Sequence, residues 1–187
     1  MYRQIAVYVN KMDPANEKSS CFFTGHRIMS VREAARAANL TGRLCEKLIN
    51  KHGVTDFITG GAIGYDLIAA REVIRLRSRY PIRLHMYLPC TDQTERWRKD
   101  QQEEWKRVSA AADFVRYITD GPYSAGCMQK RNRAMVDSAY FGIAFCLYGR
   151  GGTAWTLRYA QKRGRKVALL TAPGSEAERI GAETVYI

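Results

Sequence analysis

Short apolar segments alternate with amphipathic segments along most of this chain, and this alternation restricts the fold more than any other feature. The apolar segments, such as Tyr140–Leu147, are nearly continuous, which is typical of parallel strands covered on both faces. The amphipathic segments carry apolar residues at helical spacing. The sequence therefore predicts an α/β protein with an open, mostly parallel sheet and helices on both faces. The expected strands cover residues 21–24, 54–59, 82–88, 113–118, 140–148 and 166–171, and the expected helices cover residues 30–51, 62–79, 94–111, 126–138 and 152–163.

The length of 187 residues fits a single domain with a substantial core. We assign this domain to residues 21–171. Residues 1–20 form an N-terminal arm or an extra edge strand in this interpretation. Residues 172–187 are expected to form a C-terminal tail that packs on the domain.

Composition argues against several classes of protein. No apolar run reaches the roughly 18–20 residues that span a bilayer, and the first 20 residues lack the apolar core of a signal peptide. The five cysteines are scattered without a C-x-x-C spacing, and the three histidines lie far apart. We therefore expect a cytoplasmic protein with reduced cysteines, no metal centre and no membrane partner.

A glycine-rich corner follows the apolar run that ends at Tyr148. Gly151 and Gly152 let the backbone turn sharply and come close to a ligand, and Thr153 adds a hydroxyl where a helix begins. The free amides and the positive end of the helix dipole favour an anion at such a corner. A tight turn also needs glycine for packing alone, so one corner does not decide the question.

Two further corners repeat this pattern. The first follows the expected strand 54–59 and contains Gly60, Gly61 and Gly64, a spacing that resembles G-x-G-x-x-G without satisfying it. The other is the segment 24–27, in which an arginine follows a glycine turn. Because strand ends of an open α/β sheet meet at one edge, the three corners together predict a phosphate-containing ligand there.

The net charge of +12 is concentrated in residues 121–166, which hold nine Lys or Arg residues against one acid, Asp137. Such a field attracts nucleotides or nucleic acid, although a solvated helix face has the same composition.

Asp66, early in the second helix, is a candidate to accept hydrogen bonds from a ribose hydroxyl, or it complements the helix dipole. Trp97 shares a helix with Trp105 in this interpretation and is the better candidate to line a pocket. The predicted ligand-binding residues are Thr24, Gly25, His26, Arg27, Thr59, Gly60, Gly61, Gly64, Asp66, Pro89, Trp97, Tyr123, Arg131, Asn132, Asp137, Gly151, Gly152 and Thr153.

Six short blocks together resemble the YpsA-like family of the SLOG superfamily, which also holds the DNA-processing protein DprA and the LOG phosphoribohydrolases. The resemblance covers about residues 21–171 and implies a Rossmann-like nucleotide-binding domain with its ligand at the strand ends. It assigns pocket positions to Thr24, Gly25, Arg27, Gly60, Gly61, Asp66, Gly152 and Thr153. The blocks occur in family order and are Cys21–Arg27, Phe57–Asp66, Leu88–Cys90, Pro122–Met128, Arg131–Asp137 and Gly151–Ala154.

One departure from the LOG enzymes bears on catalysis. Those enzymes carry Pro-Gly-Gly-x-Gly-Thr-x-x-Glu, and its glutamate takes part in cleaving an N-glycosidic bond. Thr156 stands at the corresponding position of this chain. Because a hydroxyl cannot replace a carboxylate as general base, we do not expect phosphoribohydrolase activity by that route.

Three functional hypotheses follow. The first is a sensor or regulatory module that binds a nucleotide-derived small molecule, such as an adenine nucleotide, ADP-ribose or an NAD-like compound. The second is a hydrolase of nucleotides or NAD with Asp66 or Asp137 as acid and base. The third is a DprA-like module that binds single-stranded nucleic acid through the basic surface of residues 121–166. The sequence firmly implies no cofactor and leaves catalysis undecided, and a homodimer paired through helices is a further expectation.

Overall fold

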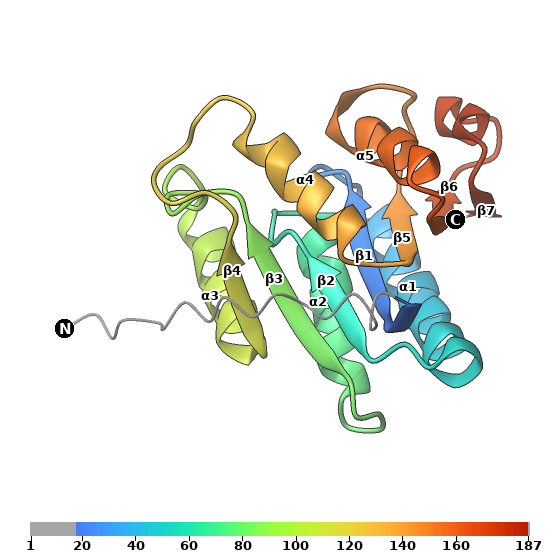
Figure 1. Cartoon of the computed structure of the whole chain (residues 1–187), viewed down its shortest axis with the longest axis horizontal. Helices are drawn as coiled ribbons and strands as arrows, with labels where there is room; N and C mark the ends of the chain where they lie inside the picture. Colours follow the sequence, from blue (N-terminus) through green and yellow to red (C-terminus); the bar gives the residue numbers. More distant parts are fainter. Residues whose placement is uncertain (1–17, 187) are drawn as a thin grey trace.

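A seven-stranded parallel sheet with helices on both faces forms the protein (Figure 1). The computed structural model describes residues 18–186, with side chains described through Glu183. The strands are β1 (Ser20–Gly25), β2 (Asp56–Thr59), β3 (Arg83–Leu88), β4 (Phe114–Tyr117), β5 (Phe141–Phe145), β6 (Lys166–Thr171) and β7 (Glu183–Tyr186). The helices are α1 (Val31–His52), α2 (Tyr65–Leu76), α3 (Lys99–Ala111), α4 (Cys127–Asp137), α5 (Gly151–Lys162) and the 3₁₀ helix η2 (Glu176–Ile180).

The strand order β4-β3-β2-β1-β5-β6-β7 explains where a ligand site can form. The chain proceeds outward from β1 to β4 and then returns to place β5 against the other side of β1. The direction of strand addition therefore reverses between β1 and β5. In open α/β sheets, ligands bind outside the carboxyl ends of the strands at this point.

Two hydrophobic clusters hold the layers together. One cluster joins β1, β2, β3 and β5 to α1, α2 and α3, and the other joins the opposite sheet face to α4, α5 and η2 (Figure 1). All five residues of β5 are buried, which is the reason for its uninterrupted apolar sequence. These observations confirm the predicted fold class.

Local signals place the ends of α1. Ser30 and Glu33 form a reciprocal capping box at its start, and Gly53 ends it in the left-handed region with φ +65°. Five residues connect the end of β1 at Gly25 to the start of α1 at Val31, so this loop lies at the carboxyl edge of the sheet.

Three predicted elements are longer than the observed ones by four residues or more. The strand predicted over 140–148 ends at Phe145, and the amide of Leu147 is instead bound by a side chain. The helix predicted over 62–79 begins at Tyr65, after a glycine loop. The helix predicted over 94–111 begins at Lys99, so Trp97 precedes α3 and does not share it with Trp105.

The two ends of the chain were also assigned from the sequence. The arm or edge strand predicted for residues 1–20 falls almost wholly outside the described residues, although Ser20 begins β1. After Thr171 the chain forms η2 and then β7, which pairs in parallel with β6 at the edge of the sheet.

Candidate functional site

A cavity of about 270 Å³ opens at the carboxyl ends of the strands, where the strand order reverses. The end of β1 forms one wall, the first turn of α4 another and the start of α5 a third. We call this the switch-point cavity. Its lining consists of Phe23, Thr24, Gly25, His26, Arg27, Ala62, Asp66, Met128, Arg131, Asn132, Met135, Gly152 and Thr153.

The backbone of the β1–α1 loop packs closely against the backbone at the start of α2. The carbonyl of His26 accepts a hydrogen bond from the Tyr65 amide at 3.1 Å. Gly64 lies beside this contact with φ +85°, and a Cβ there would lie 2.5 Å from the carbonyl oxygens of His26 and Arg27. Glycine at position 64 therefore supports the wall of the cavity, and the residue itself does not line it.

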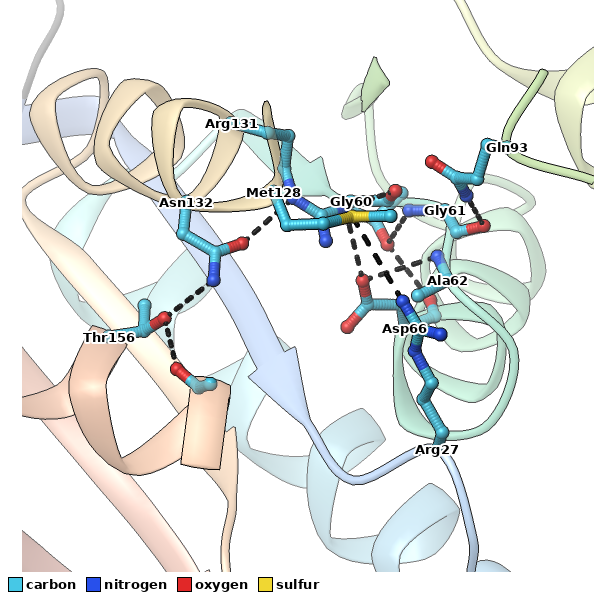
Figure 2. Close-up of polar contacts among 12 residues, drawn as sticks. Arg27, Gly60, Gly61, Ala62, Asp66, Gln93, Met128, Arg131, Asn132 and Thr156 are labelled. Atoms are coloured by element: carbon cyan, nitrogen blue, oxygen red, sulfur yellow. Dashed lines mark hydrogen bonds and ion pairs between the residues drawn. The ribbon is translucent and has the colours of Figure 1, made fainter. Parts of the chain in front are cut away.

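Asp66 and Arg131 form a buried ion pair at the base of the cavity (Figure 2). Their closest atoms, Arg131 Nη1 and Asp66 Oδ2, are 3.7 Å apart, and the Ala62 amide donates to the same carboxylate oxygen at 3.3 Å. Arg131 Nη1 also donates to the Gly60 carbonyl. A Cβ at position 60 would overlap that nitrogen, so any other residue there would displace the Arg131 guanidinium. The glycine corner after β2 thus leaves room for the Arg131 guanidinium.

Burial changes the protonation equilibria of this pair. Desolvation raises the pKa of Asp66, and the charge of Arg131 and the hydrogen bond from Ala62 oppose the rise. Desolvation likewise lowers the pKa of Arg131, against the attraction of Asp66. Each charge therefore depends on the other for its compensation.

The third wall joins α4 to α5 through a chain of hydrogen bonds (Figure 2). Asn132 Nδ2 donates to Thr156 Oγ1 at 2.9 Å, and that hydroxyl donates to the Gly152 carbonyl at 2.8 Å. Thr156 is fully buried, so the position that bears glutamate in LOG enzymes holds a hydroxyl bonded within the helix. The first turn of α5 has no side-chain cap among the described residues, and a Cβ at Gly152 would meet no atom within 4 Å. The helix start is therefore open toward the cavity.

Arg27 places a guanidinium group at the mouth of the cavity. Its side chain is exposed, and its Nη2 atom lies 4.0 Å from the sulfur of Met128 (Figure 2). No carboxylate among the described residues forms an ion pair with it. Its charge is consequently available to an anion.

Half of the 18 predicted residues line this cavity. They come from four separate parts of the chain and are Thr24, Gly25, His26, Arg27, Asp66, Arg131, Asn132, Gly152 and Thr153. Four others support it from behind. The Thr59 hydroxyl donates to the Asp66 carbonyl at 3.0 Å and accepts from the Gly61 amide at 3.3 Å, while Gly60 and Gly64 make the close contacts described above.

The other five predicted residues lie apart from the described lining. Pro89 is buried after β3, and Trp97 lies in the loop before α3. Tyr123 is exposed on the β4–α4 loop, where its amide donates to Asp92 at 2.7 Å. Gly151 opens α5 but is turned to solvent.

Asp137 is at the wrong end of its helix for the predicted role. It ends α4 at the amino edge of the sheet, because β5 begins four residues later, and it is bound by Tyr159 at 3.0 Å and Arg163 at 2.9 Å. The prediction that it lies with Arg131 and Asn132 at the ligand edge is therefore wrong. Two positions along a helix rotate a side chain by about 200°, so Asp137 points away from the cavity that Met135, two residues earlier, lines.

Four lining residues were not predicted: Phe23, Ala62, Met128 and Met135. Met128 and Met135 lie on the same helix, α4. Their spacing of seven residues places both on one helix face, and that face covers the cavity as well as the core. The sequence holds no signal that separates these two roles.

His26 fixes the end of β5 from within the cavity wall. Its Nε2 atom accepts a hydrogen bond from the Leu147 amide at 2.8 Å, which requires the neutral ring. Burial lowers the pKa of His26 below its ordinary value, with Glu33 opposing the change. A proton on Nε2 would remove this bond and leave the amide without its acceptor.

This arrangement predicts a pH-dependent stability. Because the folded-state pKa is depressed, the unfolded chain binds more protons, and stability falls as pH decreases from about 7.5 through the ordinary histidine pKa of about 6.5. His26→Gln retains an acceptor oxygen without titrating, so its thermal midpoint should fall less over pH 7.5–5.5. The difference between the two melting curves isolates His26, since His52 and His85 are present in both proteins. Parallel curves would contradict this role.

The sheet, its switch point and the cavity at the carboxyl edge define a Rossmann-like α/β protein with a polar, cation-bearing pocket. Residues 21–164 match the model of the YspA SLOG family (YpsA), and the chain belongs to this family. This confirms the resemblance found in the sequence.

Individual relatives agree with this assignment. The chain is 33% identical over 129 residues to the uncharacterized SPbeta prophage-derived protein YoqJ of Bacillus subtilis. The aligned residues cover 63% of this chain and 75% of YoqJ. It is 31% identical over 87 residues to a UPF0398 protein of Bacillus pumilus, covering 46% of this chain and 47% of that protein. The alignment therefore spans about half the length of the second relative.

Two solved structures share the fold. DNA processing protein A of Helicobacter pylori superposes with a TM-score of 0.66 at 18% identity, over 90% of this chain and 76% of that chain. DprA of Streptococcus pneumoniae gives a TM-score of 0.66 at 17% identity, over 89% of this chain and 58% of that chain. Within the described part of the chain, no helix combines the length and apolar character needed to cross a membrane.

Proposed function

We propose that the protein binds a nucleotide or nucleotide-derived ligand in the switch-point cavity and acts as a sensor or regulatory module. One observation carries the proposal: Arg27, the uncapped start of α5 and the buried Asp66 converge on a single cavity although they lie far apart in the sequence. The first two suit a phosphate group, and a carboxylate suits ribose hydroxyls. The volume of about 270 Å³ is near the lower end of small-molecule sites.

Membership of the SLOG family supports this proposal, as does the fold shared with DprA. The Helicobacter pylori protein binds single-stranded DNA, which keeps nucleic acid among the candidate ligands. Hydrolysis is the weaker alternative, because Asp137 lies at the other edge of the sheet and Thr156 replaces the LOG glutamate. Asp66 is then the remaining acid, and any turnover should be lost in Asp66→Asn.

Thermal unfolding against AMP, ADP, ATP, ADP-ribose, NAD, cyclic nucleotides and GTP tests the proposal. A ligand at about 100 times its Kd adds about 2.7 kcal/mol of stability, a rise in Tm of about 5–10 °C for a chain of this size. We expect such a rise with one class of nucleotide in the wild type and its loss in Arg27→Ala. Arg32→Ala, on the exposed face of α1, is the control and should bind normally. Absence of a shift with every nucleotide, or an unaltered shift in Arg27→Ala, would exclude this site.

A further inference from the structure

A second cavity, of about 480 Å³, lies beside the switch-point cavity between the β5–α5 loop and η2. Three of its lining residues are arginines, and we call it the arginine cavity. Its lining consists of Gly149, Arg150, Arg158, Gln161, Glu176, Arg179 and Ile180.

The arginine cavity carries an excess of positive charge. Arg158 Nη2 donates to the Gly149 carbonyl at 2.6 Å, which holds its guanidinium against the loop. Glu176 is the single acid of the lining, and its Oε2 accepts from the Gly149 amide at 3.0 Å. No ion pair of the described residues includes Arg150, Arg158 or Arg179. Glu178, also on η2, lies outside this lining and accepts a hydrogen bond from the Gly174 amide at 3.2 Å. Three guanidinium groups against one carboxylate in the lining are the composition of an anion site.

One loop separates the two cavities. Gly149 lines the arginine cavity and Gly152 lines the switch-point cavity, and three residues of chain span at most about 11 Å. The two linings therefore come within about 11 Å of each other at this loop.

The separation of the cavities decides which ligand fits both. The two phosphates of a pyrophosphate share a bridging oxygen, so ADP-ribose or NAD places both in one cavity. Phosphates of a single-stranded nucleic acid are separated by a nucleoside unit and can lie on either side of the loop. We propose that the arginine cavity binds a backbone phosphate of a short single-stranded nucleic acid whose neighbouring nucleotide occupies the switch-point cavity. This inference rests on the proposed function and extends it to an oligonucleotide.

Fluorescence anisotropy with a labelled five-nucleotide single-stranded DNA tests this inference, with AMP binding measured by calorimetry on the same proteins. The test variant is Arg150→Gln/Arg179→Gln. The control is Lys162→Gln/Lys166→Gln, which removes the same charge near the amino edge of the sheet. We expect the test variant to lose at least tenfold in DNA affinity and the control to lose less than twofold. The slope of log affinity against log salt should be shallower by about 0.7 in the test variant, the value for one phosphate contact of a single strand.

The two measurements separate the possible failures. AMP affinity should stay within twofold of wild type in both double variants, because neither changes the switch-point cavity. If the test and control variants lost DNA affinity equally, the arginine cavity would be overturned as a distinct phosphate site. The same conclusion would follow if the test variant lost as much affinity for AMP as for DNA. Binding of AMP or ADP-ribose without binding of DNA would overturn the inference and leave the proposed function standing. Absence of binding to any nucleotide or DNA would overturn both.

Discussion

Gly152→Asp should abolish nucleotide binding while leaving the stability of the protein nearly unchanged. A side chain at position 152 meets no protein atom within 4 Å of its Cβ, and the backbone there has no positive φ, so the fold accepts the substitution. The new carboxylate would lie at the open start of α5, where we place a phosphate. We expect a loss of affinity of at least 100-fold by calorimetry and a change in Tm below about 2 °C, as for a strain-free surface substitution.

Gly152→Asn is the matched control because it has the same size without the charge. The helix dipole and Arg27 attract an anion, so the carboxylate should compete with a phosphate more strongly than the amide does. The asparagine variant should therefore bind at least tenfold more tightly than the aspartate variant. Equal affinities would show that position 152 acts only by steric exclusion, and wild-type affinity in Gly152→Asp would remove α5 from the site.

Arg131→Met should destabilise the protein by about 3–5 kcal/mol, the usual cost of removing one partner of a buried ion pair. Asp66 is 5% exposed and Arg131 is 6% exposed, so the carboxylate left behind has little access to water. The Gly60 carbonyl also loses its donor. Chemical denaturation at pH 7 measures this loss.

The double variant Asp66→Asn/Arg131→Met should recover part of that stability, because it removes the uncompensated charge. In Arg131→Met the folded-state pKa of Asp66 rises further above its ordinary value of 3.8. Stability of that variant is then retained below the ordinary carboxyl pKa and lost as pH rises through the folded-state pKa. Additive losses in the double variant, or a stability deficit independent of pH between 4 and 7, would contradict the ion-pair argument.

Much of the fold could be predicted because its signals are local. The buried residues of β5 are consecutive in the sequence, and Ser30 with Glu33 marks the start of α1. The boundaries that were wrong depend on distant residues. The strand that ends at Phe145 was predicted to continue because His26, which binds the Leu147 amide, is 121 residues away.

The site was predicted in part for the same reason. Glycine turns after strands are visible in the sequence, and they led to Arg27, Asp66 and Gly152. The side of each helix that faces the cavity is not visible, so Asp137 was included and Met128 was omitted. Trp97 was placed on a helix that begins two residues after it.

The sequence alone determined the α/β class, the glycine corners and the excess of basic residues, because periodicity, turn geometry and charge are properties of neighbouring residues. Only the tertiary structure decided which corners meet. The return of β5 to the side of β1 brings Gly152 to Arg27 and Asp66, and it seats Arg131 against Gly60. The same return places three arginines in a second cavity on the far side of one loop. Strand order is a property of the whole sheet, since each strand is placed by the burial of both its faces among distant neighbours.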